Sequence, residues 1–261
     1  MTLLALILLF SLVGGLLSVT AAAVYLLLPE STRERAMPHL VSFATGALLS
    51  AALVGLLPEA MNNKMGVSAQ AITTTVLAGL LLFFVLEKLV IWRHAHHDDH
   101  ELHPAEMHVH SQRAAGMLIV IGDAIHNFVD GILIGAAFLT DTHLGIVTAL
   151  AVAAHEIPQE LGDFAILLNS GYSRGKAFFY NLLSSVTTVL GGLLVWLGLS
   201  QSSPALPYLT AIAAASFLYI AVADLIPGMH KKTGFRDSAL QLMLICLGIL
   251  AIVLAEHLLL G

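Results

Sequence analysis

The sequence has few charged residues and a single cysteine. Only 11% of its 261 residues are charged, whereas a soluble domain contains about 25%. The lone Cys246 excludes a disulfide within the chain. Hydrophobic residues make up 58% of the sequence, and the mean hydropathy is +0.89. These values exclude an ordinary soluble domain and predict an integral membrane protein embedded in a lipid bilayer.

Long apolar runs occupy nearly the whole chain. A membrane-spanning helix needs about 20 mostly apolar residues. Eight windows meet this requirement: 3–28, 37–59, 67–92, 114–139, 143–170, 174–200, 204–228 and 236–260. Their short connections leave no room for a soluble catalytic or nucleic-acid-binding domain, so we expect no nucleic-acid partner. The sequence predicts an all-α integral membrane protein with eight transmembrane helices in one domain over residues 1–261.

The positive charges predict the orientation of these helices. Connections on the cytoplasmic side of a membrane collect Lys and Arg. The connections after the first, third, fifth and seventh windows, with their edges, carry ten of the eleven Lys and Arg residues: Arg33, Arg35, Lys88, Arg93, Arg113, Arg174, Lys176, Lys231, Lys232 and Arg236. Only Lys64 lies in another connection. We therefore expect a multi-pass protein of the plasma or inner membrane with both termini outside.

Two of the apolar windows contain clusters of polar residues. The fourth reads GDAIHNFVDG and the fifth reads HEIPQELGD. Their polar residues are Asp123, His126, Asn127 and Asp130, followed by His155, Glu156, Gln159, Glu160 and Asp163. Residues three or four apart share one face of a helix, so each cluster forms a polar stripe. Such groups are costly in lipid and mark functional sites, and we expect the two stripes to meet near the membrane midplane.

The chemistry of these stripes indicates a divalent metal ion. Imidazole, carboxylate and amide ligands together suit Zn²⁺ and also accept Fe²⁺, Mn²⁺ or Cd²⁺. A calcium site built from oxygen atoms would not need two histidines. Pro158 cannot donate a hydrogen bond to the carbonyl of Ala154, so it predicts a kink in the fifth helix. Broken helices of this kind recur at the midplane substrate sites of transporters.

A histidine-rich segment, 93–113, connects the third and fourth windows. It holds seven of the thirteen histidines: His94, His96, His97, His100, His103, His108 and His110. Histidine-rich tracts bind metal through their composition alone. We expect a disordered cytoplasmic loop that binds released metal without forming a fixed site.

The motifs HNFVDG and HEIPQELGD resemble the paired signatures of the ZIP (Zrt/Irt-like) family of divalent metal transporters, closest to the branch that reads HExPHExGD. Four further segments are also similar to that branch: FATGALLSAALVGLLPEA, FFVLEK, SGYSRGKAFFYNLLS and LYIAVADLIP. The resemblance implies a bundle of eight helices built around an inverted repeat, often a homodimer. It also implies transport by movement of a bundle that includes helices four and five.

The resemblance assigns ligands for two metal ions. For the first ion these are His126, Asp130, His155 and Gln159. For the second they are Asn127, Asp130 and Glu156, with Asp130 bridging. Gln159 departs from the branch, which usually has histidine there, and an amide is the weaker ligand. Glu160 is an alternative or supporting ligand, while Asp123 is a stepping stone on the exit path or a structural cap.

The expected function is transport of Zn²⁺, or of Fe²⁺, Mn²⁺ or Cd²⁺, into the cytoplasm, with the metal as substrate and no cofactor. Two alternatives come from other classes. A proton-driven metal exporter would also use intramembrane His and Asp, although such exporters usually have six spans and a soluble C-terminal domain. An intramembrane metallopeptidase would need an HExxH pair, and Gln159 breaks that pair. We therefore expect a transporter that is not an enzyme.

Overall fold

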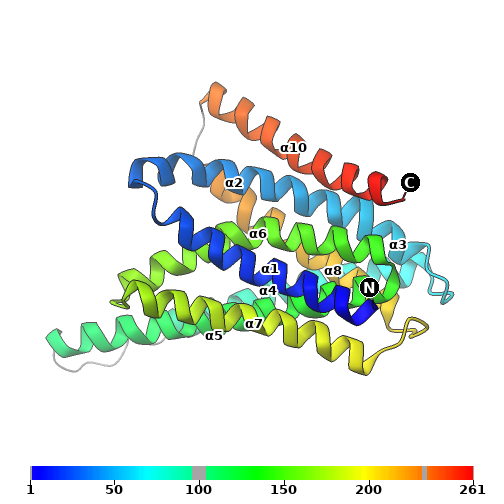
Figure 1. Cartoon of the computed structure of the whole chain (residues 1–261), viewed down its shortest axis with the longest axis horizontal. Coiled ribbons are helices and arrows are strands. Elements are labelled where there is room, and N and C mark those ends of the chain that lie inside the picture. The colour runs from blue at the N-terminus through cyan, green and yellow to red at the C-terminus, as the bar shows by residue number, and fades with distance from the viewer. Residues whose placement is uncertain (1, 96–103, 231–233, 261) are drawn as a thin grey trace.

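The computed structural model describes residues 2–95, 104–230 and 234–260, and within these ranges it contains helices and no strand. Figure 1 shows the helices lying roughly alongside one another. The long uninterrupted helices are α1 (Leu3–Tyr25), α4 (Ala69–Ala95), α5 (Pro104–Thr140), α6 (Thr142–Asn169), α7 (Arg174–Gly198) and α10 (Phe235–Leu260). Two composite helices join several segments: α2 (Glu30–Ser50), η1 (Ala51–Leu56) and α3 (Leu57–Met61), then α8 (Leu206–Tyr219), η3 (Ile220–Leu225) and α9 (Ile226–Met229).

The predicted all-helical architecture is confirmed in these ranges. Seven helices are long and apolar enough to cross a membrane, with α2–η1–α3 and α8–η3–α9 each counted as one. The eighth long helix, α6, has 28 residues, but its histidine, glutamates and other polar residues lower its hydropathy. Each predicted window thus coincides with a long helix. The chain is a multi-pass integral membrane protein.

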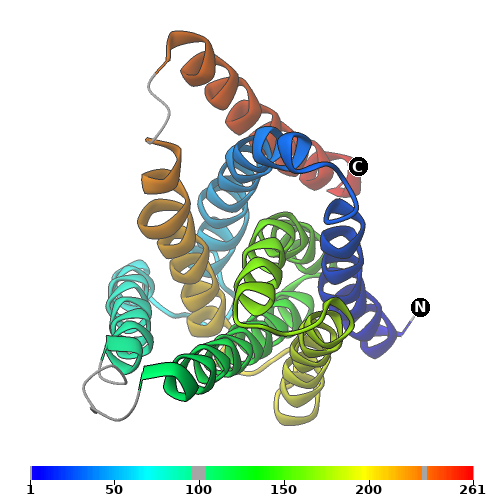
Figure 2. The same cartoon turned by 90° about the vertical axis from the view of Figure 1, so that its left-hand side faces the viewer.

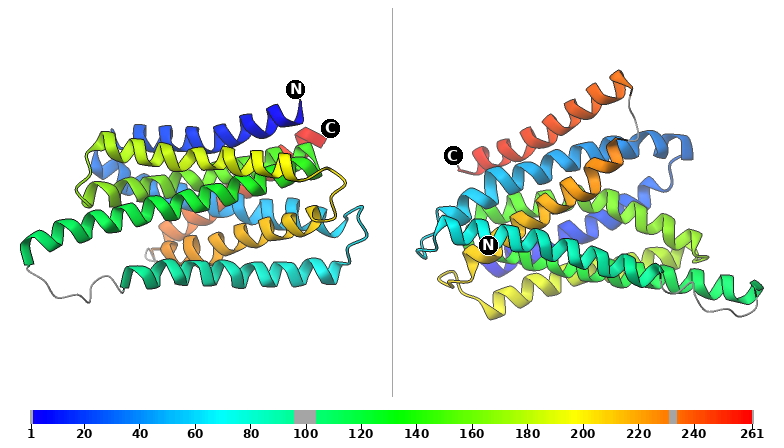
Figure 3. Two further views of the ribbon diagram at one scale, coloured as in Figure 1. Left: turned by 90° about the horizontal axis from the view of Figure 1, so that it is seen from below. Right: turned by 180° about the vertical axis from the view of Figure 1, so that it is seen from behind.

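The helices run back and forth, so the N- and C-termini lie at the same end of the molecule (Figure 1). The ends of α4 and α5 that approach residues 96–103 lie at the opposite end (Figure 3). Residues 104–113, predicted as part of a disordered loop, instead form the first turns of α5. The predicted loop histidines His96, His97, His100 and His103 lie outside the described residues.

Glycines allow α5 and α7 to approach closely. A Cβ atom added to Gly131 would lie 1.9 Å from the carbonyl oxygen of Thr188, and one added to Gly191 would lie 2.1 Å from that of Phe128. No side chain fits at such distances, so the two backbones are in direct contact. Small residues are a general means of packing helices in lipid, where apolar surface alone gives no driving force. Gly131 directly follows Asp130, so this contact fixes the depth and rotation of the polar stripe on α5.

The composite helices contain two π-helical turns that the sequence patterns did not reveal. In η1 the N–H of Leu57 bonds the carbonyl of Ala52, and in η3 the N–H of Ile226 bonds that of Ala221. A proline follows each of these residues, Pro58 and Pro227. Proline lacks the N–H that would continue the α-helical pattern, and a widened turn accommodates this loss. The two composite helices therefore share one local structure in the first and the last parts of the chain.

The helices divide into a central group and peripheral members. Figure 2, which looks along the bundle, shows α6 among α1, α2, α5 and α8. α10 packs mainly on α2, and α4 mainly on α8, at the edges of the bundle. α6 continues through Pro158 as one helix and changes direction along its length (Figure 1). The polar stripe of α6 is consequently enclosed by other helices.

Candidate metal centre

The two histidines predicted as ligands meet between α5 and α6. Nε2 of His126 lies 3.3 Å from Nε2 of His155. Nδ1 of His155 lies 3.1 Å from the carbonyl oxygen of Ala151, one turn earlier in the same helix. Since a carbonyl can only accept, this contact assigns the proton to Nδ1 and leaves the Nε2 lone pair free. A histidine oriented in this way is ready to coordinate a metal through Nε2.

Two carboxylates complete the group around the histidines. Oδ2 of Asp130 lies 3.1 Å from Nε2 of His155 and 3.8 Å from Nε2 of His126. Oε1 of Glu156 lies 3.4 Å from Nε2 of His126 and 3.6 Å from that of His155. One ligand atom from each of the four residues falls within 4.8 Å of the others. The two polar stripes therefore meet between α5 and α6.

The oxygens of Asp130 and Glu156 have no hydrogen-bond partner in the described part of the chain, and both side chains are fully buried. Leaving such atoms without compensation is costly, because burial removes their hydration. A bound divalent cation would supply the missing interaction for both carboxylates and both imidazoles at once. Two nitrogen and two oxygen donors form a set that suits Zn²⁺.

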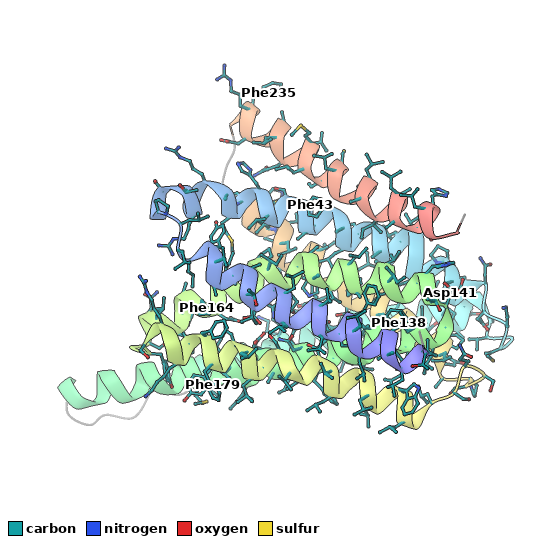
Figure 4. The ribbon with its side chains drawn as sticks, in the orientation of Figure 1. Phe43, Phe138, Asp141, Phe164, Phe179 and Phe235 are labelled. Carbon is teal, nitrogen blue, oxygen red and sulfur yellow. The ribbon has the colours of Figure 1, made fainter. Side chains whose placement is uncertain are left out.

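The metal centre lies between two apolar layers of the bundle. One layer contains Phe138, Leu144 and Phe217, and the other contains Val120, Phe164 and further buried residues. Figure 4 shows Phe138 and Phe164 well separated along the length of the bundle. The ring of Phe217 also lies against that of His155, with centroids 6.0 Å apart. Apolar layers thus lie on both sides of the polar group along the bundle, while the side chain of His126 remains 26% exposed.

The side chain of Asn127 forms hydrogen bonds with α7 and with its own helix, α5. Its Nδ2 donates to the backbone carbonyl and the Oδ1 atom of Asp123, at 3.2 and 3.0 Å. Its Oδ1 accepts from the hydroxyl of Thr188 at 2.9 Å. Both polar atoms of the side chain are therefore hydrogen-bonded to protein groups, whereas among the described residues the carboxylates of Asp130 and Glu156 have no hydrogen-bond partner and lie beside the two histidines.

The side chains of Gln159 and Glu160 form hydrogen bonds with residues outside the group of His126, Asp130, His155 and Glu156. Nε2 of Gln159 donates to Oδ1 of Asp123 at 3.3 Å. Oε1 of Glu160 accepts from the hydroxyl of Ser185 at 3.0 Å, while its Oε2 has no hydrogen-bond partner among the described residues. Glu160, Asp123 and Glu156 form a second group whose ligand atoms lie within 4.8 Å of one another.

The contribution of α7 was missed from the sequence. The hydroxyls of Ser185 and Thr188 support Glu160 and Asn127, and the amide of Asn181 donates to the backbone carbonyl of Glu160 at 3.4 Å. A signal was present, because Asn181, Ser185 and Thr188 recur at intervals of four and three residues on one face of an apolar helix. The same periodicity identified the stripes on α5 and α6.

The fold and this site define a class of protein: a multi-pass helical membrane protein with a buried group of metal-ligating side chains. The family model described as "ZIP Zinc transporter" matches residues 1–256. The chain belongs to the ZIP family. ZIP proteins are transporters, which sets aside the metallopeptidase alternative.

Curated relatives agree with this assignment. The chain is 41% identical over 141 residues to zinc transporter foi of Drosophila melanogaster. The aligned region covers 53% of this chain and 19% of that protein. It is 43% identical over 126 residues to human zinc transporter ZIP4, and this alignment covers 48% of the chain and 19% of human ZIP4. It is 32% identical over 234 residues to zinc transporter ZIP13 of Pongo abelii, and this alignment covers 84% of the chain and 66% of that ZIP13. The chain thus spans between about a fifth and two thirds of the length of these relatives.

Proposed function

We propose that this chain carries divalent metal cations, Zn²⁺ first among them, across a membrane through the centre formed by His126, Asp130, His155 and Glu156. The observation that carries the proposal is the convergence of four ligand atoms within 4.8 Å in the buried interior of the bundle. The relatives named as zinc transporters support Zn²⁺ as the substrate. Fe²⁺, Mn²⁺ and Cd²⁺ are accepted by the same types of ligand.

The apolar layers on either side of the centre support an alternating mechanism. A cation bound between them would move on when one layer opens while the other remains closed. The family resemblance places this movement in a bundle that includes α5 and α6. The close backbone contact at Gly131 couples α7 to α5, and we therefore include α7 among the elements that move together.

The proposed topology has eight crossings, with both termini outside and net transport into the cytoplasm. Two observations support it. The termini lie at the same end of the bundle (Figure 1), as an even number of crossings requires, and the Lys and Arg residues concentrate in the connections at the other end. The matching π-helical turns of η1 and η3 support an inverted repeat that relates the first three long helices to the last three. A homodimer in the plasma or inner membrane completes the proposal.

The experiment that tests this function is metal uptake into proteoliposomes that contain the purified chain. A fluorescent indicator for Zn²⁺ inside the vesicles reports uptake, and competing Fe²⁺, Mn²⁺ and Cd²⁺ establish the selectivity. Protease accessibility of each terminus measures the fraction of molecules in each orientation. We expect saturable Zn²⁺ entry that empty liposomes lack. Absence of transport for all four cations by correctly inserted protein would refute the proposal.

A further inference from the structure

A cavity opens at the end of the bundle where both termini lie, apart from the metal centre. Its volume is about 280 Å³, close to the lower end of the range for ligand sites, about 300–1,000 Å³. It lies where α3 and α5 end and α8 begins (Figure 1). Thr140 on its wall follows Asp130 by ten residues, which is about 15 Å along α5. The cavity is therefore a separate feature of the fold.

Two side chains of opposite charge line this cavity. Glu59 and Lys64 form no ion pair and no side-chain hydrogen bond among the described residues. Lys64 is exposed, and the other ten Lys and Arg residues concentrate in connections at the opposite end. A lysine repels a bare divalent cation. Its presence beside Glu59 favours a ligand that carries a negative group as well as a positive one.

The turn that carries Lys64 is held in place by Asn63. Nδ2 of Asn63 donates to the carbonyls of Ala60 and Val67, at 2.9 Å each. Its Oδ1 accepts from the backbone N–H groups of Met65 and Val67, at 3.1 and 3.0 Å. The backbone at Lys64 is consequently fixed before any ligand arrives, and such preorganisation lowers the entropic cost of binding.

The inner wall of the cavity is apolar and carries two hydroxyls. Leu139 and Leu206 are buried there. The hydroxyls of Thr140 and Thr210 lie 3.4 Å apart, and each donates to a backbone carbonyl of its own helix. Their lone pairs can still accept hydrogen bonds. An apolar wall behind a charged rim accommodates the side chain of a small molecule whose charged groups stay at the rim.

We propose that this cavity binds a complex of Zn²⁺ with one α-amino acid, and so captures metal that reaches the membrane already chelated. The inference rests on the proposed function, because it takes Zn²⁺ as the substrate and this end as the outside. An α-amino acid binds Zn²⁺ through its amino nitrogen and one carboxylate oxygen. The ammonium proton is released to solvent, and the complex keeps one net positive charge.

Each part of the complex has a partner in the cavity. The carboxylate of Glu59 binds the metal, since oxygen donors are ligands for Zn²⁺. The ammonium group of Lys64 binds the outer carboxylate oxygen of the amino acid. Leu139 and Leu206 contact its side chain. Because these three contacts lie at different places around the α-carbon, the cavity distinguishes the L form of an amino acid from the D form.

Zn²⁺ uptake into proteoliposomes at a fixed concentration of free Zn²⁺ tests this site. L-Histidine is added outside, and total Zn²⁺ is raised so that an external indicator shows constant free Zn²⁺. We expect uptake to rise severalfold with L-histidine and to change little with D-histidine, which binds Zn²⁺ equally well. Lys64→Gln should abolish the increase. Lys64→Arg and the control Lys88→Gln, on α4, should keep it.

Direct binding gives a measurement that does not depend on transport. The purified full chain, with the seven histidines of 93–113 changed to Ser, is dialysed against radiolabelled L-histidine with and without Zn²⁺. We expect labelled histidine to bind only when Zn²⁺ is present. Glu59→Gln and Lys64→Gln should each weaken this binding by about tenfold, because each removes one charged contact.

Three results would overturn the site. The first is uptake that follows free Zn²⁺ alone, the second is an equal increase with L- and D-histidine, and the third is wild-type binding of labelled histidine by both folded variants. Failure of the proposed function would appear separately, as absence of Zn²⁺ uptake by the wild-type chain when no amino acid is added.

Discussion

At the scale of single residues, the orientation of each side chain decides which atom it can offer to a cation. The contact of Nδ1 in His155 with the Ala151 carbonyl directs Nε2 toward His126. Among the described residues, the oxygens of Asp130 and Glu156 have no hydrogen-bond partner, whereas the side chain of Asn127 is hydrogen-bonded. Residues of similar chemistry on the same stripe therefore differ in their readiness to bind metal.

Removing one ligand of the centre should abolish transport without unfolding the protein. We expect His126→Ala and Asp130→Ala each to lower Zn²⁺ uptake by about a hundredfold or more, because lipid offers no replacement ligand. Uptake into proteoliposomes, normalised to the amount of inserted protein, measures the effect. His257→Ala, at the far end of α10, is the control and should transport normally. Wild-type rates in both variants would show that the centre is assigned to the wrong residues.

Gln159 is the position at which a single substitution should alter selectivity. We expect Gln159→His to raise the preference for Zn²⁺ over Mn²⁺ by about tenfold, equivalent to about 1.4 kcal/mol, because imidazole is the better ligand for Zn²⁺. Slower release could lower the maximal rate at the same time. Competition uptake with both ions measures the preference. An unchanged preference would indicate that residue 159 serves only to position Asp123, to which its amide now donates.

At the scale of elements, the contact between α5 and α7 determines where the polar residues lie. Gly131 and Gly191 bring the two backbones together, and the hydroxyls of α7 then reach Asn127 and Glu160. Without this close approach the supporting hydrogen bonds could not form. The glycine of the HNFVDG motif is thus part of the site, although it carries no ligand atom.

Substituting Gly131 should separate these helices. A Cβ at this position would lie 1.9 Å from a backbone oxygen of α7, so we expect Gly131→Ala to lower thermal stability by several degrees and to abolish most uptake. Gly122 offers a control on the same helix, because a Cβ there meets nothing within 4 Å. Gly122→Ala should be neutral or stabilise the helix by up to about 1 kcal/mol. Equal melting temperatures for the two variants would contradict the close contact.

At the scale of the whole molecule, apolar layers lie on either side of the metal centre along the bundle. The described parts of the histidine-rich segment, 93–95 and 104–113, form the end of α4 and the start of α5. These described parts therefore lie away from His126 and His155, where we place the transport site. The histidines of the segment can add to the number of ions bound without being part of the obligatory route.

Replacing the seven histidines of 93–113 by Ser should leave most transport intact. We expect Zn²⁺ uptake within about twofold of wild type, because the centre between α5 and α6 is unchanged. The number of metal ions bound per chain should fall, as mass spectrometry of the purified protein would show. A variant in which the same number of exposed residues elsewhere is changed to Ser controls for expression. Complete loss of uptake by inserted protein would place the segment on the obligatory path.

The sequence determined the helical architecture and four members of the candidate centre. Apolar runs of sufficient length predict helices in lipid whatever their neighbours, since no other element satisfies its own backbone there. Spacings of three and four residues placed His126 and Asp130 on one face, and His155 and Glu156 are adjacent in the next helix. These features depend on local periodicity, which a single sequence displays.

Only the tertiary structure decided how those residues are used. The partner of Asn127 is Thr188, 61 residues away, and the partner of Glu160 is Ser185, on the same distant helix. Helical periodicity says which face a residue occupies but not which helix covers that face. The helical start of α5 at Pro104 and the π-helical turns before Pro58 and Pro227 likewise lay outside the pattern. The second carboxylate group emerged from packing, because it requires α5, α6 and α7 to meet at one depth.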